Sequence, residues 1–446
     1  MAGWSDIREV ARQTPPERDR YVDFLRIVAI CFVVVGHWNA SALFIDGEKP
    51  QLEQLLKFAP WAQWATWLFQ VMPIFFFVGG YSNGASWASA SRREIGFASW
   101  ARDRLTRLLL PLVPLVAVWV IAGSVGLALQ LDSGLVSNAS RLSLIPVWFL
   151  AVYVVVTLVT PVTRRLWKTH GMGTFWALAA GAVVVDAVAL SLDAIWLRWI
   201  NYGFIWLALH QLGYAWQDGH LEKLHRPLTL AAVGAVGFLF VEFDLSYPIA
   251  MVSVPGQEIS NSRPPSVALL TLGMVQTGLV VAVAAPMRRL MQRETLWMLT
   301  IFDNRVIMTL FLWHVSAMVL SMGLAVFFLG GLGLHEVPGS GQWWWLRIPW
   351  MVAFAAVTWV FIFAFSGFER RARPVPQVAS PEWKVAGALF ACYGLIFLAL
   401  YGIISESGHG IRILPAAAVV SRYSPRQSAH AGEANSSTAV SIPVST

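Results

Sequence analysis

Two ionisable residues, Arg26 and His37, lie in the first long apolar segment of the chain, residues 24–45. Eleven steps of about 100° along a helix return a side chain to within about 20° of its starting direction, and eleven rises of 1.5 Å separate the two groups by about 16 Å. An arginine binds phosphate oxygens at two points, and a buried neutral histidine suits a general base. The pair therefore indicates proton transfer beside a phosphate-bearing ligand. The alternative is an arginine that snorkels to the interface and a histidine bonded to a neighbouring helix.

Other ionisable residues lie within or beside apolar segments: Asp23, Asp186, His210 and His314. Because a charge in lipid is costly, each of them marks a candidate functional site. Asp23 precedes Arg26 by three residues, so it either orients that arginine through a salt bridge or caps the start of the helix. Asp186 is expected to pair with a histidine, either His210 or His314, across helices.

Arg104 and Arg107 stand three residues apart at the entrance of the third apolar segment. At this spacing both side chains can point to one side of a helix and bind the charge of a diphosphate. The alternative is that they only anchor the helix at the cytosolic membrane surface.

The composition indicates that these residues are positioned by elements of a membrane protein. The chain has 446 residues, of which 57% are hydrophobic and 13% charged, and its mean hydropathy is +0.60. A soluble domain carries about 25% charged residues, so water-soluble classes are excluded. The net charge of +7 is assigned to cytosolic loops rather than to a nucleic-acid partner. The two cysteines, Cys31 and Cys392, are too few and too far apart for a disulfide framework or a Cys-based metal site, and no metal is expected.

Eleven apolar segments approach the length of about 20 residues that a bilayer core requires. They cover residues 24–45, 64–84, 108–130, 145–167, 174–192, 196–216, 228–245, 267–287, 306–329, 344–366 and 384–404. The seventh is the weakest, because Glu242 and Asp244 lie near its end. Alternation with the period of a strand is absent. The sequence therefore predicts an all-α integral membrane protein, a polytopic bundle of about ten or eleven transmembrane helices.

Lysines and arginines concentrate in alternate connections, which predicts a cytosolic N-terminus in a multi-pass plasma-membrane protein. Three regions follow: a cytosolic segment at 1–21, a transmembrane domain at 22–404, and a tail at 405–446. The tail is rich in Ser, Ala and Pro, which predicts extracytoplasmic disorder. The oligomeric state is not predicted.

Several motifs occur in an order that resembles the membrane-bound acyltransferase 3 family. Residues 20–37 resemble its opening signature, an Arg, ten residues and a His in the first transmembrane helix. Residues 72–81 resemble its aromatic and glycine-rich second helix, and 104–111 resemble its Arg-x-x-Arg motif entering the third. Residues 148–150 and 312–314 resemble shorter recurrent patches. The resemblance covers most of the chain from 21 to about 366.

The resemblance implies a membrane-bound O-acyltransferase. Such an enzyme moves an acyl group, most often acetyl, from acyl-CoA (acetyl-CoA) to a hydroxyl of a sugar or another envelope or secreted molecule. The acceptor is then expected to be a glycan or glycolipid of a bacterial envelope, and no cofactor is permanently bound. By the same resemblance His37 would be catalytic with Arg26 as its partner. The donor would be bound by Arg104, Arg107 and Tyr81, and the site supported by Asp23, Trp148 and His314.

Two chemical routes remain open for such a reaction. His37 would either take the proton of the acceptor hydroxyl directly or carry the acyl group as an acyl-histidine. Pro73 is expected to kink the second segment, while Gly79 and Gly80 either open a slot for the acyl arm or only set helix packing.

A different class, a proton-coupled transporter or flippase, would use His37, Asp186 and His314 as a proton relay. The absence of an internal repeat and the clustering of arginines count against it.

Overall fold

A computed structural model describes residues 4–47, 49–370 and 381–403. The tail predicted for 405–446 lies outside these residues. The described chain is almost entirely helical, so the prediction of an all-α polytopic membrane protein is confirmed. By length and composition, eight helices in this part of the chain can cross a membrane, or nine if one bent pair forms a single span. Between their two ends, helices satisfy their backbone groups internally, which an apolar solvent demands.

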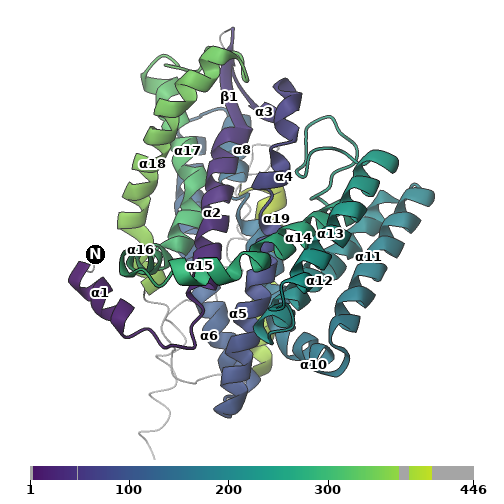
Figure 1. The fold of residues 1–446 in the computed structure, drawn as a ribbon. Helices are drawn as coiled ribbons and strands as arrows, with labels where there is room; N and C mark the ends of the chain where they lie inside the picture. The colour runs from purple at the N-terminus through teal and green to yellow at the C-terminus, as the bar shows by residue number, and fades with distance from the viewer. Residues whose placement is uncertain (1–3, 48, 371–380, 404–446) are drawn as a thin grey trace, which may run out of the picture.

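The candidate spans run along the length of the bundle (Figure 1). They are α2 (Arg20–Ala40), α5 (Met72–Arg92), α6 (Phe97–Leu109) with α7 (Leu112–Ala128), α8 (Ser133–Ser143) with α9 (Val147–Leu158), α11 (Met172–Ser191), α13 (His225–Leu239) with a π-helical turn (Phe240–Asp244), α17 (Ile307–Phe328) and α18 (Gly341–Arg370). The bent pair is α14 (Val267–Ala282) and α15 (Ala284–Leu290), at 53°. The seventh predicted segment, the weakest in sequence, is thus among the candidate spans.

The remaining helices are shorter or lie beside these spans. They are α1 (Trp4–Arg12), α3 (Leu55–Phe58), α4 (Thr66–Phe69), α10 (Thr160–His170), α12 (Asn201–Gln217), α16 (Glu294–Asn304) and α19 (Pro381–Tyr401), with 3-10 turns at Pro60–Gln63 and Ile195–Ile200. Predicted segments 196–216 and 384–404 overlap α12 and α19, so every predicted segment overlaps a helix.

The only strands in the described chain form a hairpin at one end of the bundle. β1 (Ser41–Asp46) pairs antiparallel with β2 (Lys49–Gln54), and Ser41 lies opposite Gln54. We call this end of the bundle the hairpin end, and the opposite end, where α2 begins at Arg20, the basic end. The prediction of helix to residue 45 is therefore wrong for its last residues, because the chain leaves α2 at Ala40 and becomes extended.

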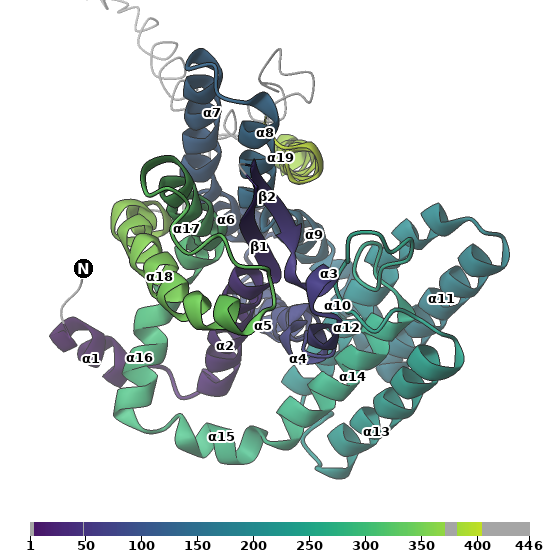
Figure 2. The same cartoon turned by 90° about the horizontal axis from the view of Figure 1, so that it is seen from above.

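The core of the fold surrounds α2 and α5. Seen from above, α2 stands between α5 on one side and α17 and α18 on the other, while α11 to α14 group together beyond α5 (Figure 2). Gly80 of α5 packs so tightly against α12 that a Cβ would meet the backbone of His210. This glycine therefore serves helix packing. The predicted kink at Pro73 is wrong, because Pro73 lies in the first turn of α5, where proline is tolerated without a lost hydrogen bond.

Candidate active site

His37 of α2 and His314 of α17 meet directly, although they are far apart in sequence. Nδ1 of His37 lies 2.8 Å from Nε2 of His314, and the two rings are parallel with centroids 5.1 Å apart. His314 is completely buried, whereas His37 is half-buried. The contact pairs a motif residue of the first spanning helix with a residue that the sequence suggested only as support.

The hydrogen bonds around this pair determine which nitrogens carry protons. Nδ1 of His314 lies 2.7 Å from the carbonyl oxygen of Phe311, one turn earlier in α17. A carbonyl can only accept, so this nitrogen carries the proton. In a neutral pair, Nε2 of His314 then accepts from Nδ1 of His37, which leaves the lone pair of His37 on Nε2. A histidine that donates through one nitrogen to an orienting group and keeps the other free has the geometry of a general base.

Arg26 lies on the same helix, nearer the basic end. Its guanidinium donates to the hydroxyl of Ser82 on α5 at 3.0 Å and lies 3.6 Å from the carboxylate of Asp23. Asp23 is buried and also forms an ion pair with Arg18 at 2.6 Å. Of the two predicted roles of Asp23, the salt bridge with Arg26 is confirmed. The helix is capped instead by Asp19, whose side chain accepts from the backbone N–H of Tyr21.

Arg104 of α6 meets Arg26 at the same residue of α5. Arg104 donates to the backbone carbonyl of Ser82 at 3.3 Å, while Arg26 binds its hydroxyl. Two cations from separate helices therefore converge on one turn of α5. Like charges held together in this way favour an anionic ligand beside them.

A pocket of about 320 Å³ opens beside this turn at the basic end. It lies between the end of α5 and the start of α6, and its lining is rich in arginine and serine: Ser86, Ser89, Ala90, Arg93, Ile95, Trp100, Asp103, Arg104 and Arg107. The predicted pair Arg104 and Arg107 thus shares one cavity. A volume of this size lies within the range of small-molecule sites, about 300 to 1,000 Å³.

Of this pocket lining, sequence reasoning named only Arg104 and Arg107, and it missed Ser86, Arg93 and Trp100 as well as the neighbouring Ser82. Ser82 follows directly after the glycine-rich motif, and nothing in its type distinguishes it from the other serines of α5. Trp100 donates to the hydroxyl of Ser86 at 3.0 Å, which fixes its indole on the wall of the pocket. Arg93 was counted only among the basic residues of a loop, and that count was the one signal available for it.

Two predicted site residues lie elsewhere. The ring of Tyr81 packs against Trp216 of α12, with centroids 5.0 Å apart, and is not part of the pocket lining. Trp148 of α9 contacts Tyr202 at 6.3 Å. Its neighbour Phe149 is the residue that reaches α17, where its ring lies 5.6 Å from that of Phe311. Neither Tyr81 nor Trp148 is among the residues that line the pocket.

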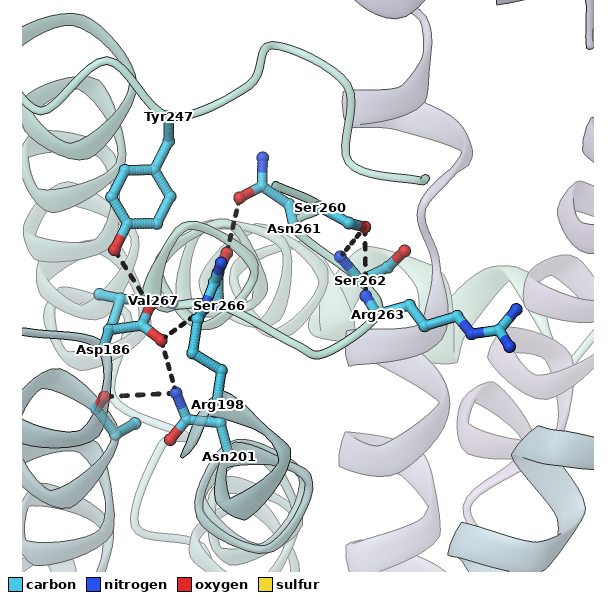
Figure 3. Close-up of polar contacts among 11 residues, drawn as sticks. Asp186, Arg198, Asn201, Tyr247, Ser260, Asn261, Ser262, Arg263, Ser266 and Val267 are labelled. Atoms are coloured by element: carbon cyan, nitrogen blue, oxygen red, sulfur yellow. Dashed lines mark hydrogen bonds and ion pairs between the residues drawn. The ribbon is translucent and has the colours of Figure 1, made fainter. Parts of the chain in front are cut away.

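Asp186 does not pair with a histidine, and the prediction that it does is wrong. Its carboxylate accepts from Arg198 at 2.9 Å and from three further donors, which join α11, α12 and α14 (Figure 3): Asn201 at 2.8 Å, the hydroxyl of Tyr247 at 3.2 Å and the backbone N–H of Val267 at 2.8 Å. Burial and the adjacent Asp186 carboxylate raise the pKa of Tyr247, so this phenol stays protonated and donates. Asp186 is 2% exposed and Arg198 is fully buried, as expected of a structural ion pair.

His210 also lies in the packed interface between helices. It is fully buried in α12, where Nε2 lies 3.3 Å from the side-chain nitrogen of Asn83 on α5. Among the described residues, neither His210 nor Asp186 forms a hydrogen bond or an ion pair with His37 or His314. The relay of His37, Asp186 and His314 that a transporter would require is therefore not assembled here.

Comparison with known families identifies the class of protein. The family model of the acyltransferase 3 family, described as an acyltransferase domain, matches residues 19–328, from α2 through α17. The chain therefore belongs to this family, and it is an acyltransferase of the membrane. No curated protein and no solved structure matches the chain. The matched residues include both histidines and the arginines that line or adjoin the pocket.

Proposed function

We propose that this acyltransferase moves an acyl group, in the first instance acetyl, from acyl-CoA to a hydroxyl of a sugar or another envelope or secreted molecule. The observation that carries the proposal is the arrangement of His37, His314 and the Phe311 carbonyl, which leaves one oriented nitrogen free on His37. An oriented general base contributes about 10² to 10⁴ in rate to proton transfer of this kind.

The arginine cluster supports acyl-CoA as the donor. CoA carries several phosphate groups, and the pocket with Arg93, Arg104 and Arg107 offers guanidinium groups beside the tryptophan ring of Trp100. Arg26 lies next to Arg104 through Ser82, and the helical rise from Arg26 to His37 is about 16 Å. In the proposed arrangement the phosphates bind at the basic end and the acyl arm extends along α2 toward His37.

The proposed reaction balances without an additional reagent. Nε2 of His37 takes the proton of the acceptor hydroxyl as its oxygen attacks the thioester carbonyl carbon. The tetrahedral intermediate then collapses, the C–S bond breaks, and the sulfur leaving group takes the proton back from His37. A covalent acyl-histidine is the variant route, with Nε2 as the nucleophile.

The distribution of charge supports an orientation for the protein in a bacterial plasma membrane. The connections rich in arginine lie at the basic end, so the N-terminus and the donor pocket are proposed to face the cytosol. The hairpin end would then face outward, where envelope glycans or glycolipids are available as acceptors.

The function is tested by supplying acetyl-CoA labelled in the acetyl group to membranes that contain the protein. We expect label to move into a glycan or lipid fraction, and His37→Ala to lower that rate by about 10² to 10⁴ while protein level and membrane insertion remain unchanged. His335→Ala is the matched control, because His335 is exposed at the hairpin end. Retention of the wild-type rate by His37→Ala would remove the catalytic assignment. A wild-type protein that leaves all label on CoA would contradict the acyl transfer itself.

A further inference from the structure

A buried arginine of α18 binds the end of the helix that carries His37. Arg347 is only 3% exposed, and its guanidinium donates to the backbone carbonyls of Trp38 and Ser41. These carbonyls belong to the last turn of α2 and to the residue that caps it. Helix ends leave such carbonyl groups without partners inside the helix, so Arg347 satisfies two acceptors at the point where α2 stops.

The charge of Arg347 has no carboxylate partner among the described residues. The rings of Trp343 and Phe354 flank its guanidinium, at 4.7 and 5.6 Å. A cation in a membrane-spanning helix is costly, and residues that carry this cost are commonly functional. Its favourable partner here is the negative end of the α2 dipole. Arg347 thus differs from Arg198, whose charge is balanced by Asp186.

The same turn of α2 is also connected to α17. The indole of Trp38 donates to the backbone carbonyl of His314 at 2.9 Å, and its ring lies 5.7 Å from that of Phe354. Trp38 is the residue directly after His37. One continuous set of contacts therefore runs from Arg347 on α18, through Trp38 on α2, to His314 on α17.

We infer that Arg347 is a positioning residue for the reaction. By binding the last carbonyls of α2, it holds the turn that carries His37 against His314 and so keeps Nε2 of His37 in a fixed place. A displacement of about 1 Å at a reacting group can lower a rate about 10²-fold. This inference rests on the proposed function, because it assigns a role in that reaction. Arg347 lies beyond residues 19–328, so the family match does not include it.

The kinetic test compares Arg347→Met and Arg347→Lys in the labelled acetyl transfer assay. We expect Arg347→Met to lower kcat about 10- to 100-fold with the KM for acetyl-CoA unchanged, since the donor pocket lies at the other end of α2. Lysine retains a donor and the charge, so Arg347→Lys should recover much of the loss. Arg263→Met is the matched control, because Arg263 is an exposed arginine at the same end of the molecule and should leave kcat unchanged. Wild-type kcat in Arg347→Met, or a change in KM alone, would overturn the inference.

A second measurement does not depend on turnover. Diethyl pyrocarbonate modifies neutral imidazole nitrogens, and mass spectrometry measures its rate of reaction at each histidine. We expect Arg347→Met to change the rate at His37 several-fold and to leave the rate at exposed His335 unchanged. If the wild-type protein transfers no acetyl group, the proposed function fails, while this rate still reports whether Arg347 positions His37. If Arg347→Met does not fold, the same rate in Arg347→Lys decides: a smaller change confined to His37 supports the role, whereas a wild-type rate at His37, or a rate changed as strongly at His335 as at His37, contradicts it.

Discussion

Two polar clusters, one around Asp186 and one around His37 and His314, have opposite chemistry. All four interactions of the Asp186 carboxylate are filled by donors from neighbouring segments. The histidine pair instead uses a chain of single hydrogen bonds that ends on the Phe311 carbonyl and leaves one nitrogen of His37 unused. A carboxylate whose acceptor positions are all occupied holds helices together, whereas an oriented histidine with one free nitrogen can act on a ligand.

The difference also explains why residue type alone was a poor guide to role. An aspartate and a histidine in an apolar segment are both costly, and each marks a candidate site. The partners of such a residue decide whether it is structural or catalytic, because a buried charge is stabilised when every lone pair has a donor. The predictions below test this contrast, beginning with the largest effect.

Asp186→Ala is expected to destabilise the fold by about 3 to 5 kcal/mol, because it leaves the buried guanidinium of Arg198 without its partner. Thermal unfolding in detergent measures this loss. The acyl transfer rate of each folded molecule should remain close to wild type, because the cluster does not contact the histidines.

The double variant Asp186→Leu with Arg198→Met provides the control for this prediction. Replacing both charges with apolar side chains of similar size should restore most of the stability. If Asp186→Ala instead abolished transfer while the protein stayed stable, the two clusters would not differ in the way described.

His314→Ala should lower kcat by about 10- to 100-fold, because a hydrogen bond to a group that becomes charged is worth about 1.5 to 3 kcal/mol. His314→Gln retains both an acceptor for His37 and a donor for the Phe311 carbonyl, so it should lose less. Steady-state rates of labelled acetyl transfer measure both variants. Equal rates in the alanine variant and the wild type would show that His37 needs no orienting partner.

Arg26→Lys should raise the KM for acetyl-CoA by about tenfold with a smaller effect on kcat, because lysine retains the charge and loses the planar fork that binds phosphate at two points. The measurement is the dependence of the transfer rate on acetyl-CoA concentration. Arg8→Lys is the control, since Arg8 is exposed and pairs with Glu294 on the surface. An unchanged KM would show that Arg26 does not bind the donor and that it serves only as a structural partner of Asp23.

Much of the fold could be predicted because hydropathy and helical period are local properties. Each predicted apolar segment overlaps a helix, and even the segment that ends near Glu242 and Asp244 is long and apolar enough to cross a membrane. The predictions were wrong where contacts with other parts of the fold, and not the local sequence pattern, determined where a helix begins or ends. Pro73 starts a helix instead of bending one, and α2 ends at Ala40, where Arg347 binds its last turn, although apolar residues continue.

The sequence by itself determined an all-α membrane protein with Arg26 and His37 on one helix and Arg104 and Arg107 on another, because these features depend only on residue type and spacing. Only the tertiary structure decided that His37 meets His314, that Arg26 and Arg104 share Ser82, and that Asp186 belongs to Arg198. The physical reason is that contacts between helices depend on the packing of many side chains at once. No single motif along the chain carries that information.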